Sequence, residues 1–569
     1  MKQRRVLRNA KVGLFTKPIS LNSGDRYIME PILLYDTTLR DGTQGEKITF
    51  SGEDKIKIAK KLDDLGIHYI EGGWPGANVK DKEFFESAKK IAFKNSRLTA
   101  FGATHKYGIP AQDDKNLNAI IESGAPVAMI FGKTWNLHVE KILRIRLKDN
   151  LDIIQESVAY LKTSHLKEVH YDAEHFFDGF KENRDYALQT LSAAINAGAD
   201  AIGLCDTNGG SLPHEIESIV AEVISYFNSD DRKNQNAKKV CFGIHTHNDS
   251  NLAVANSIAA VRAGAVIVQG TVNGYGERCG NADLTSIIPI LKLKMGYPCI
   301  SDDNLKKLRM VSLFVSETAN MIPLNSRPFV GKSAFAHKGG IHVNAIMKES
   351  RSYEHMDPTL VGNRQRVVVS DMSGKSNIEY KAKELGISLN NNGLDTEKIL
   401  SRIKQLEKEG YQFDVADGTF QIMMEKLANQ FKPLFDLDSF RVTIEKNKDQ
   451  PCYSHATIKI SVEGKIQDIT VAEGDGPVSA LDNALRKALN KVYPNVLDPV
   501  HLVDFKVRVL DGSDGTAARV RVLIESRDET SIWSTIGVSE DLIEASWQAL
   551  ADSFQHKLAR LEKDHSIKK

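Results

Sequence analysis

The sequence predicts an α/β protein in which a (β/α)8 TIM barrel is followed by a helical linker region and a C-terminal α+β domain. From Ile32 to about Lys294, eight short apolar runs alternate with stretches of helical period, a pattern typical of a (β/α)8 barrel. After Phe440, an order of three strands and a helix occurs twice, which indicates an internal repeat. A doubly wound open sheet is the alternative for the first part, and the count of eight favours the closed barrel.

The barrel is predicted to cover residues 29–300. Its expected strands are Ile32–Asp36, Tyr69–Gly73, Leu98–Gly102, Val127–Lys133, Glu168–Ala173, Ala201–Asp206, Cys241–His247 and Val266–Val272. Amphipathic helices are expected between them, among them Glu53–Leu65, Leu151–Leu161, Tyr186–Ala197 and Leu252–Ala263. In each of these stretches apolar residues recur at helical spacing, so one face of each helix is expected to pack on the barrel.

The pattern changes beyond the barrel. Residues 301–432 are mainly helical in pattern, with a conspicuous Gly/His stretch at Ala334–His342, and are predicted to form linker subdomains. Residues 433–569 are predicted to form the repeated domain. Its expected elements are strands Arg441–Ile444, Thr457–Val462 and Ile466–Val471, helix Val478–Val492, strands Leu502–Leu510, Arg519–Ile524 and Ser531–Ile536, and helix Asp541–Leu561. In the last helix, a stripe of Leu542, Ala545, Ala549 and Leu550 is expected to be buried.

Charge is balanced over the chain but not along it. The 569 residues carry a net charge of +1, yet residues 1–28 hold seven basic residues and a single acid. The rest of the chain therefore has a net charge of −5 and lacks the basic footprint of a nucleic-acid-binding protein, so no nucleic-acid partner is expected. We interpret residues 1–28 as a dispensable, disordered basic leader. An organellar transit peptide and a misread start upstream of Met29 are the alternatives.

Composition also bears on membranes and redox state. No apolar run approaches the ~20 residues that a membrane-spanning helix needs, so no membrane association is expected. The five cysteines are odd in number and never spaced CxxC. They are predicted to be reduced thiols of a cytoplasmic protein rather than a disulfide framework or a zinc site.

Polar residues follow nearly every predicted barrel strand, at the end of the barrel where such enzymes carry their chemistry. His245 and His247 are two residues apart on a predicted strand, so their side chains leave the same face. Asp41 in the first loop adds a carboxylate. This set suits a divalent metal ion such as Mn, Mg, Co or Zn. Because non-haem iron oxygenases use a similar set, it predicts a metal better than it predicts a reaction.

Three further features accompany the metal set. Arg40, beside Asp41, is a bidentate donor suited to the carboxylate of a small acid. Glu174, just past a predicted strand, is a candidate general base. The glycine cluster Gly274–Gly280 departs from the GxGxxG spacing and follows the last barrel strand, so dinucleotide binding is rejected. A phosphate or coenzyme A contact at this cluster stays open.

Several segments resemble those of one enzyme family. Asp36–Gln44, His245–Asp249 and Gly276–Asn281 are similar to the signatures of the isopropylmalate, homocitrate and citramalate synthases. The resemblance runs from Pro31 to the C-terminus and includes a regulatory dimerisation domain. Glu71–Asn78 and the overall length are most similar to the longer citramalate synthases of this family.

The resemblance implies an acyltransferase that condenses acetyl-CoA with a 2-oxo acid in a Claisen-type reaction and then hydrolyses the thioester. The implied acceptor is pyruvate, the implied product is (R)-citramalate, and the implied pathway leads to isoleucine. An isopropylmalate synthase using 2-oxoisovalerate is the nearest rival, followed by a homocitrate synthase. A metal-dependent carbon–carbon lyase on the same barrel and a non-enzymatic amino-acid sensor are the more distant alternatives.

The resemblance also implies roles for individual residues. The implied metal ligands are Asp41, His245, His247 and Asn281. Arg40 would stabilise the alkoxide that forms at the ketone carbon, and Thr207 would bind the carboxylate of the oxo acid.

Two residues are implied as the base that removes a proton from acetyl-CoA, namely Glu174 and His342, the latter accompanied by Tyr353. Nearby His337 is expected to be structural. The family places the linker histidine in the neighbouring subunit's site, which implies a homodimer. The repeated domain implies feedback inhibition by isoleucine, bound near Gly474–Gly476.

Overall fold

The computed structural model describes residues 30–229, 240–387, 396–449, 451–462, 465–466, 469–510, 518–529 and 531–563. The basic leader predicted at residues 1–28 lies outside the described residues. The chain divides into two compact units. One unit runs to Gly331 and includes Thr359–Asn363, and the other comprises Lys332–Pro358 and the chain from Arg364 onward. No helix among the described residues is long and apolar enough to cross a membrane.

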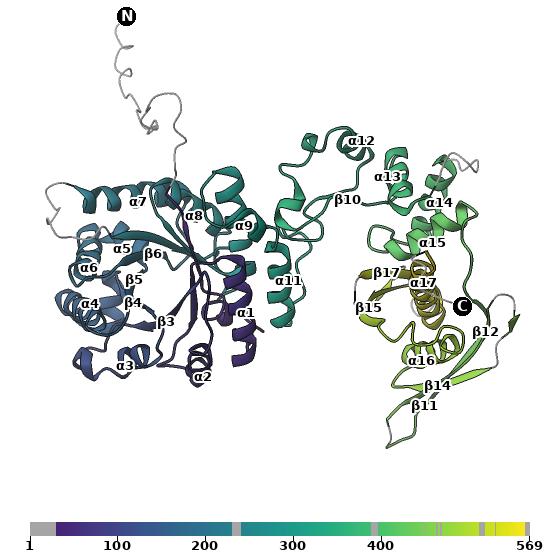
Figure 1. The fold of residues 1–569 in the computed structure, drawn as a ribbon, viewed down its shortest axis with the longest axis horizontal. Coiled ribbons are helices and arrows are strands. Elements are labelled where there is room, and N and C mark those ends of the chain that lie inside the picture. Colours follow the sequence, from purple (N-terminus) through teal and green to yellow (C-terminus); the bar gives the residue numbers. More distant parts are fainter. Residues whose placement is uncertain are drawn as a thin grey trace, which may run out of the picture. The chain divides into compact units, whose positions relative to one another are not determined.

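The first unit holds a closed barrel of eight parallel strands, which confirms the predicted fold (Figure 1). The strands are β1 Leu33–Asp36, β2 Tyr69–Gly73, β3 Arg97–Ala103, β4 Val127–Lys133, β5 Glu168–Glu174, β6 Ala201–Asp206, β7 Cys241–Thr246 and β8 Ile267–Gly270. Strand β1 pairs with β8 from Leu33–Ile267 to Asp36–Gly270, and this pairing closes the barrel.

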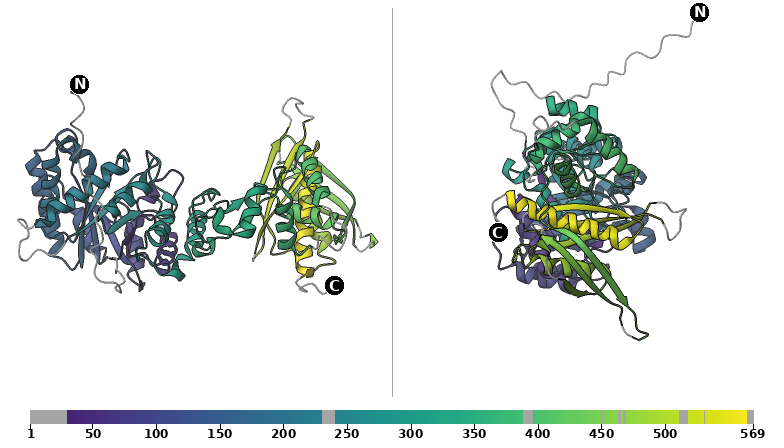
Figure 2. Two further views of the ribbon diagram at one scale, coloured as in Figure 1. Left: turned by 90° about the horizontal axis from the view of Figure 1, so that it is seen from above. Right: turned by 90° about the vertical axis from the view of Figure 1, so that its right-hand side faces the viewer.

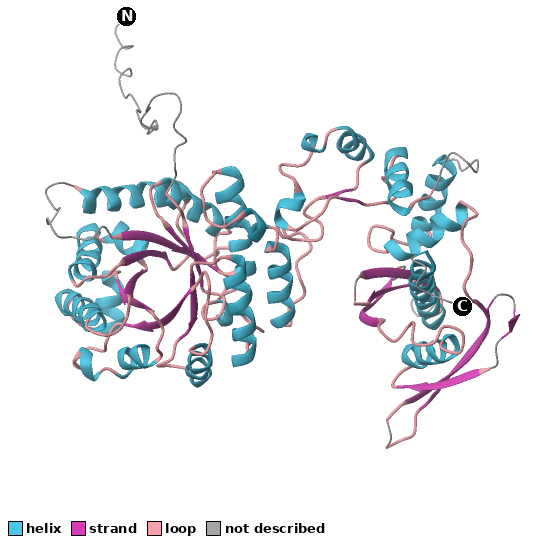
Figure 3. Cartoon of the chain, in the orientation of Figure 1, coloured by secondary structure: helices cyan, strands magenta, loops and turns pink. Residues whose placement is uncertain are grey.

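Helices surround the barrel strands on the outside (Figure 3). They include α1 Gly52–Leu65, α2 Val79–Ala88, α3 Lys115–Glu122, α4 Leu147–Lys162, α5 Phe176–Glu182, α6 Arg184–Asn196, α7 Pro213–Asn228, α8 Ala253–Arg262, α9 Leu284–Pro289, α10 Asp302–Leu305 and α11 Leu308–Thr318. Helix α1 shows how local sequence sets these bounds. The Ser51 hydroxyl caps the Asp54 amide at 3.1 Å, a contact worth about 1 kcal/mol, and the helix ends where Gly66 adopts a φ of +90°.

An apolar layer fills part of the barrel interior. It includes Tyr35, Tyr69, Phe101 and Met129. Because alternate residues of a strand face the same side, residues further along these strands also point inward. Beyond Tyr69 on β2, the inward position is Glu71, which is fully buried and bonded to the Tyr35 hydroxyl. The apolar layer therefore lies directly beneath the polar residues at the carboxyl ends of the strands.

The second unit begins with the segment after the barrel. Strands β9 Ala336–His337 and β10 Arg366–Val367 pair in parallel. Helices α12 Gly340–Lys348, α13 Lys375–Leu385, α14 Thr396–Lys408 and α15 Asp417–Leu427 follow. Ile378, Ile399, Phe420 and Met424 belong to one apolar core in this segment.

The repeated domain has the predicted order. Its elements are β11 Asp436–Glu445, β12 Tyr453–Val462, β13 Lys465–Ile466, β14 Thr470–Gly474 and α16 Pro477–Leu489, then β15 His501–Val509, β16 Val520–Arg527, β17 Ile532–Ser539 and α17 Leu542–Lys563. Both sheets are antiparallel, and Figure 2 shows α17, in yellow, against the strands of its repeat. Strands and helices of both repeats contribute to one core.

Two details of the repeated domain differ from the predictions. The expected strand Ile466–Val471 is interrupted, with its two ends in β13 and β14. The expected burial of Leu542 is wrong, because this residue begins α17 and is 41% exposed. The buried stripe of the helix includes Ala545, Ala549 and Leu550.

Candidate active site

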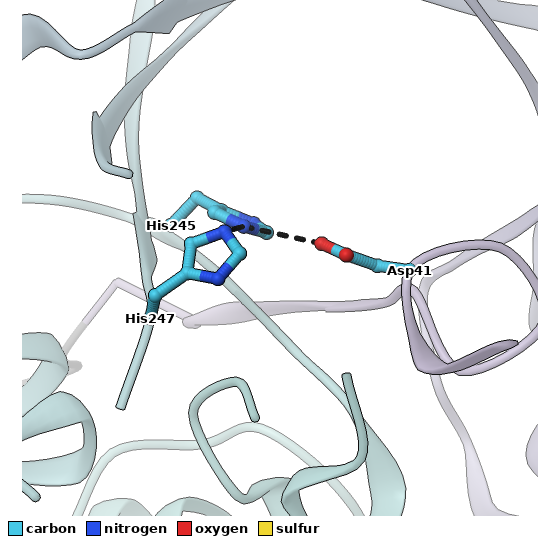
Figure 4. Close-up of side chains that lie close together, drawn as sticks. All are labelled: Asp41, His245 and His247. Carbon is cyan, nitrogen blue, oxygen red and sulfur yellow. Dashed lines mark hydrogen bonds and ion pairs between the residues drawn. The ribbon is translucent and has the colours of Figure 1, made fainter. Parts of the chain in front are cut away.

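Three predicted metal ligands converge at the carboxyl ends of β1 and β7 (Figure 4). Asp41 follows β1, His245 lies on β7, and His247 comes directly after it. One ligand atom from each residue lies within 4.8 Å of the others. His245 Nε2 is 3.3 Å from Asp41 Oδ2 and 3.2 Å from His247 Nε2. All three side chains are buried.

The chemistry of this cluster fits a divalent cation. Two imidazole nitrogens and a carboxylate oxygen face one another, and these are ligands that divalent transition metals accept. Asn281 pairs with His247 in an isolated β-bridge. Among the described residues, the buried atoms Asp41 Oδ1 and Asn281 Oδ1 have no hydrogen-bond partner. Such atoms cost about 1–3 kcal/mol each when unsatisfied, and both would be satisfied as metal ligands.

Local charges prepare Asp41 and His247 for binding a cation. Burial would raise the pKa of Asp41, but Arg40 and His245 outweigh it and hold this pKa well below its usual range. Burial, together with His245, lowers the pKa of His247 to about 3. At neutral pH, Asp41 is therefore a carboxylate and His247 a neutral imidazole, which are the protonation states that bind metals.

Arg40 is held rigidly beside this cluster. Its Nε donates to Glu71 Oε1 at 2.5 Å, and its Cζ lies 3.8 Å from the centre of the Phe101 ring. The Tyr35 hydroxyl donates to the other Glu71 oxygen at 2.7 Å. Nη1 of Arg40 lies 3.6 Å from Asp41 Oδ2. The guanidinium therefore presents its terminal nitrogens toward the metal side of the site.

Glu174, the predicted base in the barrel, ends β5. It is in register with Lys133 at the end of β4, and the Lys133 ammonium forms an ion pair with the Glu174 carboxylate. Both side chains are partly exposed, about 22–23%. The sequence places Lys133 at a strand end, but only the register of the closed barrel shows that it meets Glu174.

Thr207 follows β6, and within the described part of the chain its hydroxyl hydrogen has no acceptor. Its hydroxyl accepts a hydrogen bond from the His175 amide at 2.9 Å. Its backbone carbonyl accepts from Arg278 at 2.8 Å, and Arg278 is itself held by Asp249. The hydroxyl hydrogen of Thr207 can therefore still be donated to a ligand.

The predicted linker residues belong to the second unit. His342 lies on α12, and its ring stacks on Tyr353 with centroids 4.2 Å apart and planes 29° apart. His342 and Tyr353 are both exposed. His337 is instead engaged with Glu354, at 3.1 Å between Nε2 and Oε1. The structure thus brings His342 together with Tyr353 and places both outside the unit that carries the metal residues.

Family models match three successive parts of the chain. Residues 31–315 match the HMGL-like model. Residues 329–411 match the homocitrate synthase post-HMGL domain-like model. Residues 414–558 match the LeuA allosteric (dimerisation) domain.

Full-length relatives give a finer comparison. The chain is 53% identical to the (R)-citramalate synthase of Geobacter sulfurreducens, over 95% of this chain and 100% of that protein. It is 51% identical to the (R)-citramalate synthase of Aquifex aeolicus, over 94% of this chain and 99% of that protein. The 2-isopropylmalate synthase of Methanocaldococcus jannaschii is 31% identical over 96% of this chain and 97% of that protein.

Proposed function

The chain belongs to the (R)-citramalate synthases of the isopropylmalate, homocitrate and citramalate synthase family, and from this premise we propose that it condenses acetyl-CoA with pyruvate to form (R)-citramalate and CoA. The observation that carries the choice of pyruvate is the difference in identity between relatives. Five full-length relatives at 43–53% identity are named (R)-citramalate synthase, whereas the isopropylmalate synthase is 31% identical.

The residues of the barrel mouth support the first half of this reaction. Asp41, His245 and His247, with Asn281 beside them, would hold a divalent ion such as Mn, Mg, Co or Zn. Such an ion, when bound, polarises the ketone of a 2-oxo acid as a Lewis acid. The fixed guanidinium of Arg40 would stabilise the negative charge that develops on the ketone oxygen, and the Thr207 hydroxyl would bind the carboxylate.

Acetyl-CoA, the second substrate, must lose a proton to a base before it can react. A proton leaves the acetyl methyl group, the resulting carbon attacks the ketone carbon of pyruvate, and water then cleaves the thioester to release the CoA thiol. Glu174 is one candidate base, because Lys133 pairs with its ionised form at the barrel mouth. His342 is the other, and family resemblance supports its delivery from a second copy of the chain.

Assembly and regulation extend this proposal. Apolar side chains on the strands of the repeated domain are exposed, among them Ile444, Val507 and Val509. Together with the match to an allosteric dimerisation domain, they support a homodimer formed through this domain. The same match supports feedback inhibition, and we propose isoleucine, the end product of the implied pathway, as the inhibitor bound near Gly474–Gly476.

One assay tests the proposed reaction. Release of the CoA thiol from acetyl-CoA is measured with pyruvate, 2-oxoisovalerate and 2-oxoglutarate, each with and without isoleucine. Pyruvate is expected to give the highest kcat/KM, and isoleucine is expected to lower its rate. A higher kcat/KM for 2-oxoisovalerate would instead make the protein an isopropylmalate synthase.

A further inference from the structure

A buried series of hydrogen bonds leads from His245 away from the other metal residues. His245 Nδ1 lies 2.9 Å from Gln269 Oε1. The amide nitrogen of Gln269 donates to Asp172 Oδ1 at 2.8 Å. His245, Gln269 and Asp172 are 5%, 1% and 4% exposed. This series of hydrogen bonds therefore crosses the barrel interior from β7 through β8 to β5, with little exposure to solvent.

The direction of these hydrogen bonds follows from the donors and acceptors available. Asp172 Oδ1 accepts, so the amide of Gln269 must turn its NH2 group toward Asp172 and its oxygen toward His245. An amide oxygen can only accept, so Nδ1 of His245 carries the proton. In a neutral imidazole the other nitrogen, Nε2, then has a free lone pair. That atom lies 3.3 Å from Asp41 Oδ2, on the metal side of the ring.

An ionised Asp172 enforces this direction, because both oxygens of a carboxylate can only accept. Burial raises the pKa of Asp172, although His245 and Gln269 oppose the effect. A protonated carboxyl group carries its proton on one oxygen, and its other oxygen still accepts a hydrogen bond. Oδ1 therefore also accepts from Gln269 when the carboxyl proton lies on Oδ2.

Close packing keeps these hydrogen-bonded side chains in place. Gly203 on β6 is the register partner of Asp172. A Cβ at this position would lie 1.9 Å from Asp172 Oδ1 and 2.9 Å from the Gln269 amide nitrogen. The absence of a side chain at Gly203 is thus what allows Asp172 and Gln269 to meet.

We propose that Gln269, itself oriented by Asp172, is a positioning residue that fixes the His245 tautomer in which Nε2 is free to bind the metal. A carboxylate that orients a metal-binding histidine directly is a common arrangement, and here an amide stands between the two groups. The inference rests on the proposed metal centre and is independent of which 2-oxo acid is condensed.

The first test measures Mn²⁺ affinity in the absence of substrates. Gln269→Leu removes both hydrogen bonds and is expected to weaken Mn²⁺ binding by about 10–100-fold, the usual effect of losing such a partner. Gln269→Glu keeps an acceptor for Nδ1–H and is expected to bind within a few-fold of the parent protein. Electron paramagnetic resonance of free Mn²⁺ gives the dissociation constants, and circular dichroism confirms folding.

A matched control separates this effect from a general loss of buried hydrogen bonds. Gln555 is buried in the second unit, accepts from the Leu434 amide at 3.0 Å and donates to the Phe435 carbonyl at 2.6 Å. Gln555→Leu therefore also removes two buried hydrogen bonds and should leave Mn²⁺ affinity unchanged. Unchanged Mn²⁺ affinity in folded Gln269→Leu would overturn the role of Gln269 but leave the proposed metal centre standing. Failure of the parent protein to bind Mn²⁺ would overturn the proposed metal centre.

The tautomer can also be observed directly. In metal-free protein with ¹⁵N-labelled histidine, NMR is expected to show His245 protonated at Nδ1, with its signals identified by their loss in His245→Asn. This signature should disappear in Gln269→Leu and persist in Gln269→Glu. A His245 ring without a proton on Nδ1 in the parent protein would overturn the inference.

Discussion

The guanidinium of Arg40 donates from Nε to a carboxylate oxygen of the fully buried Glu71 at 2.5 Å. With the Phe101 ring against its other side, Arg40 has little freedom left in its charged group. Rigid donors stabilise developing charge without having to reorganise during the reaction. We therefore expect Glu71, which is buried in the barrel interior, to affect the rate of the proposed reaction by holding Arg40 in place.

Replacing Glu71 should consequently affect both stability and turnover. Glu71→Gln removes one of the two carboxylates that face Arg40, so the variant is expected to lose about 1–3 kcal/mol of stability and to show a lower kcat. Glu168 offers a matched control, because it pairs with Arg97 and accepts from the Tyr69 hydroxyl. Glu168→Gln should lower the melting temperature without lowering kcat; equal kcat values in the two variants would argue against this role of Glu71.

Metal removal should abolish turnover and lower stability together. At a concentration of 100 Kd, a ligand that binds only the folded state adds about 2.7 kcal/mol of stability. Chelation is therefore expected to lower the melting temperature, and Mn²⁺ to restore both properties. Asp41→Asn should blunt the Mn²⁺-induced thermal shift in differential scanning fluorimetry. Full activity after dialysis to a metal-free state would contradict the proposed centre.

The role of Glu174 can be measured by turnover. Glu174→Gln removes the base but keeps the shape of the side chain, and kcat is expected to fall by about 10²–10⁴-fold. Glu182 lies nearby and accepts from Trp135 and Asn136, so Glu182→Gln is a suitable control with near-normal kcat. If Glu174→Gln retains the rate of the parent protein, His342 becomes the remaining candidate.

The proposed sharing of sites between subunits has its own test. His342→Ala should fold and dimerise but lose most turnover. Co-expression with Glu174→Gln should restore about a quarter of the parent rate, because half of randomly paired dimers are mixed and each holds one intact site. No recovery in purified mixed dimers would place His342 in the site of its own chain, whereas a fully active His342→Ala would remove it from the mechanism.

One buried acid predicts a pH dependence of stability. Burial raises the pKa of Asp552 to about 6, although its hydrogen bond from Thr419 opposes the shift. Folding therefore favours the protonated form, and Asp552 destabilises the protein increasingly as pH rises from about 4 to 6. Asp552→Asn should be about 1–3 kcal/mol more stable than the parent at pH 7.5, with no such gain at pH 4. Urea unfolding at both values would show this, and a gain that does not change with pH would refute it.

Much of the barrel and its metal set can be predicted from local sequence. Alternating apolar runs are local, and Asp41, His245 and His247 stand in short motifs at strand ends. Partners across the barrel are different, because they depend on which strand ends meet after closure. Glu71 could be placed at a strand end, but its contact with Arg40 depends on the register of β1 and β2.

Gln269 illustrates the same limit more strongly. A single glutamine inside an apolar strand has no motif, and its partners come from two other strands. Leu542 shows a limit of periodicity, since a helical stripe predicts which residues share a face but not where the packed surface begins. The linker residues His342 and Tyr353 could be found by resemblance to the family. Which subunit's active site they would enter depends on how two copies of the chain associate.

The proposed reaction joins the methyl carbon of acetyl-CoA to the ketone carbon of pyruvate. The most direct measurement is ¹³C NMR of the products formed from [2-¹³C]acetyl-CoA and unlabelled pyruvate by the Mn²⁺-loaded protein. The proposed reaction predicts label in the methylene carbon of (R)-citramalate, with one CoA thiol released per molecule. Label found only in acetate would mean simple thioester hydrolysis and would contradict the proposed condensation.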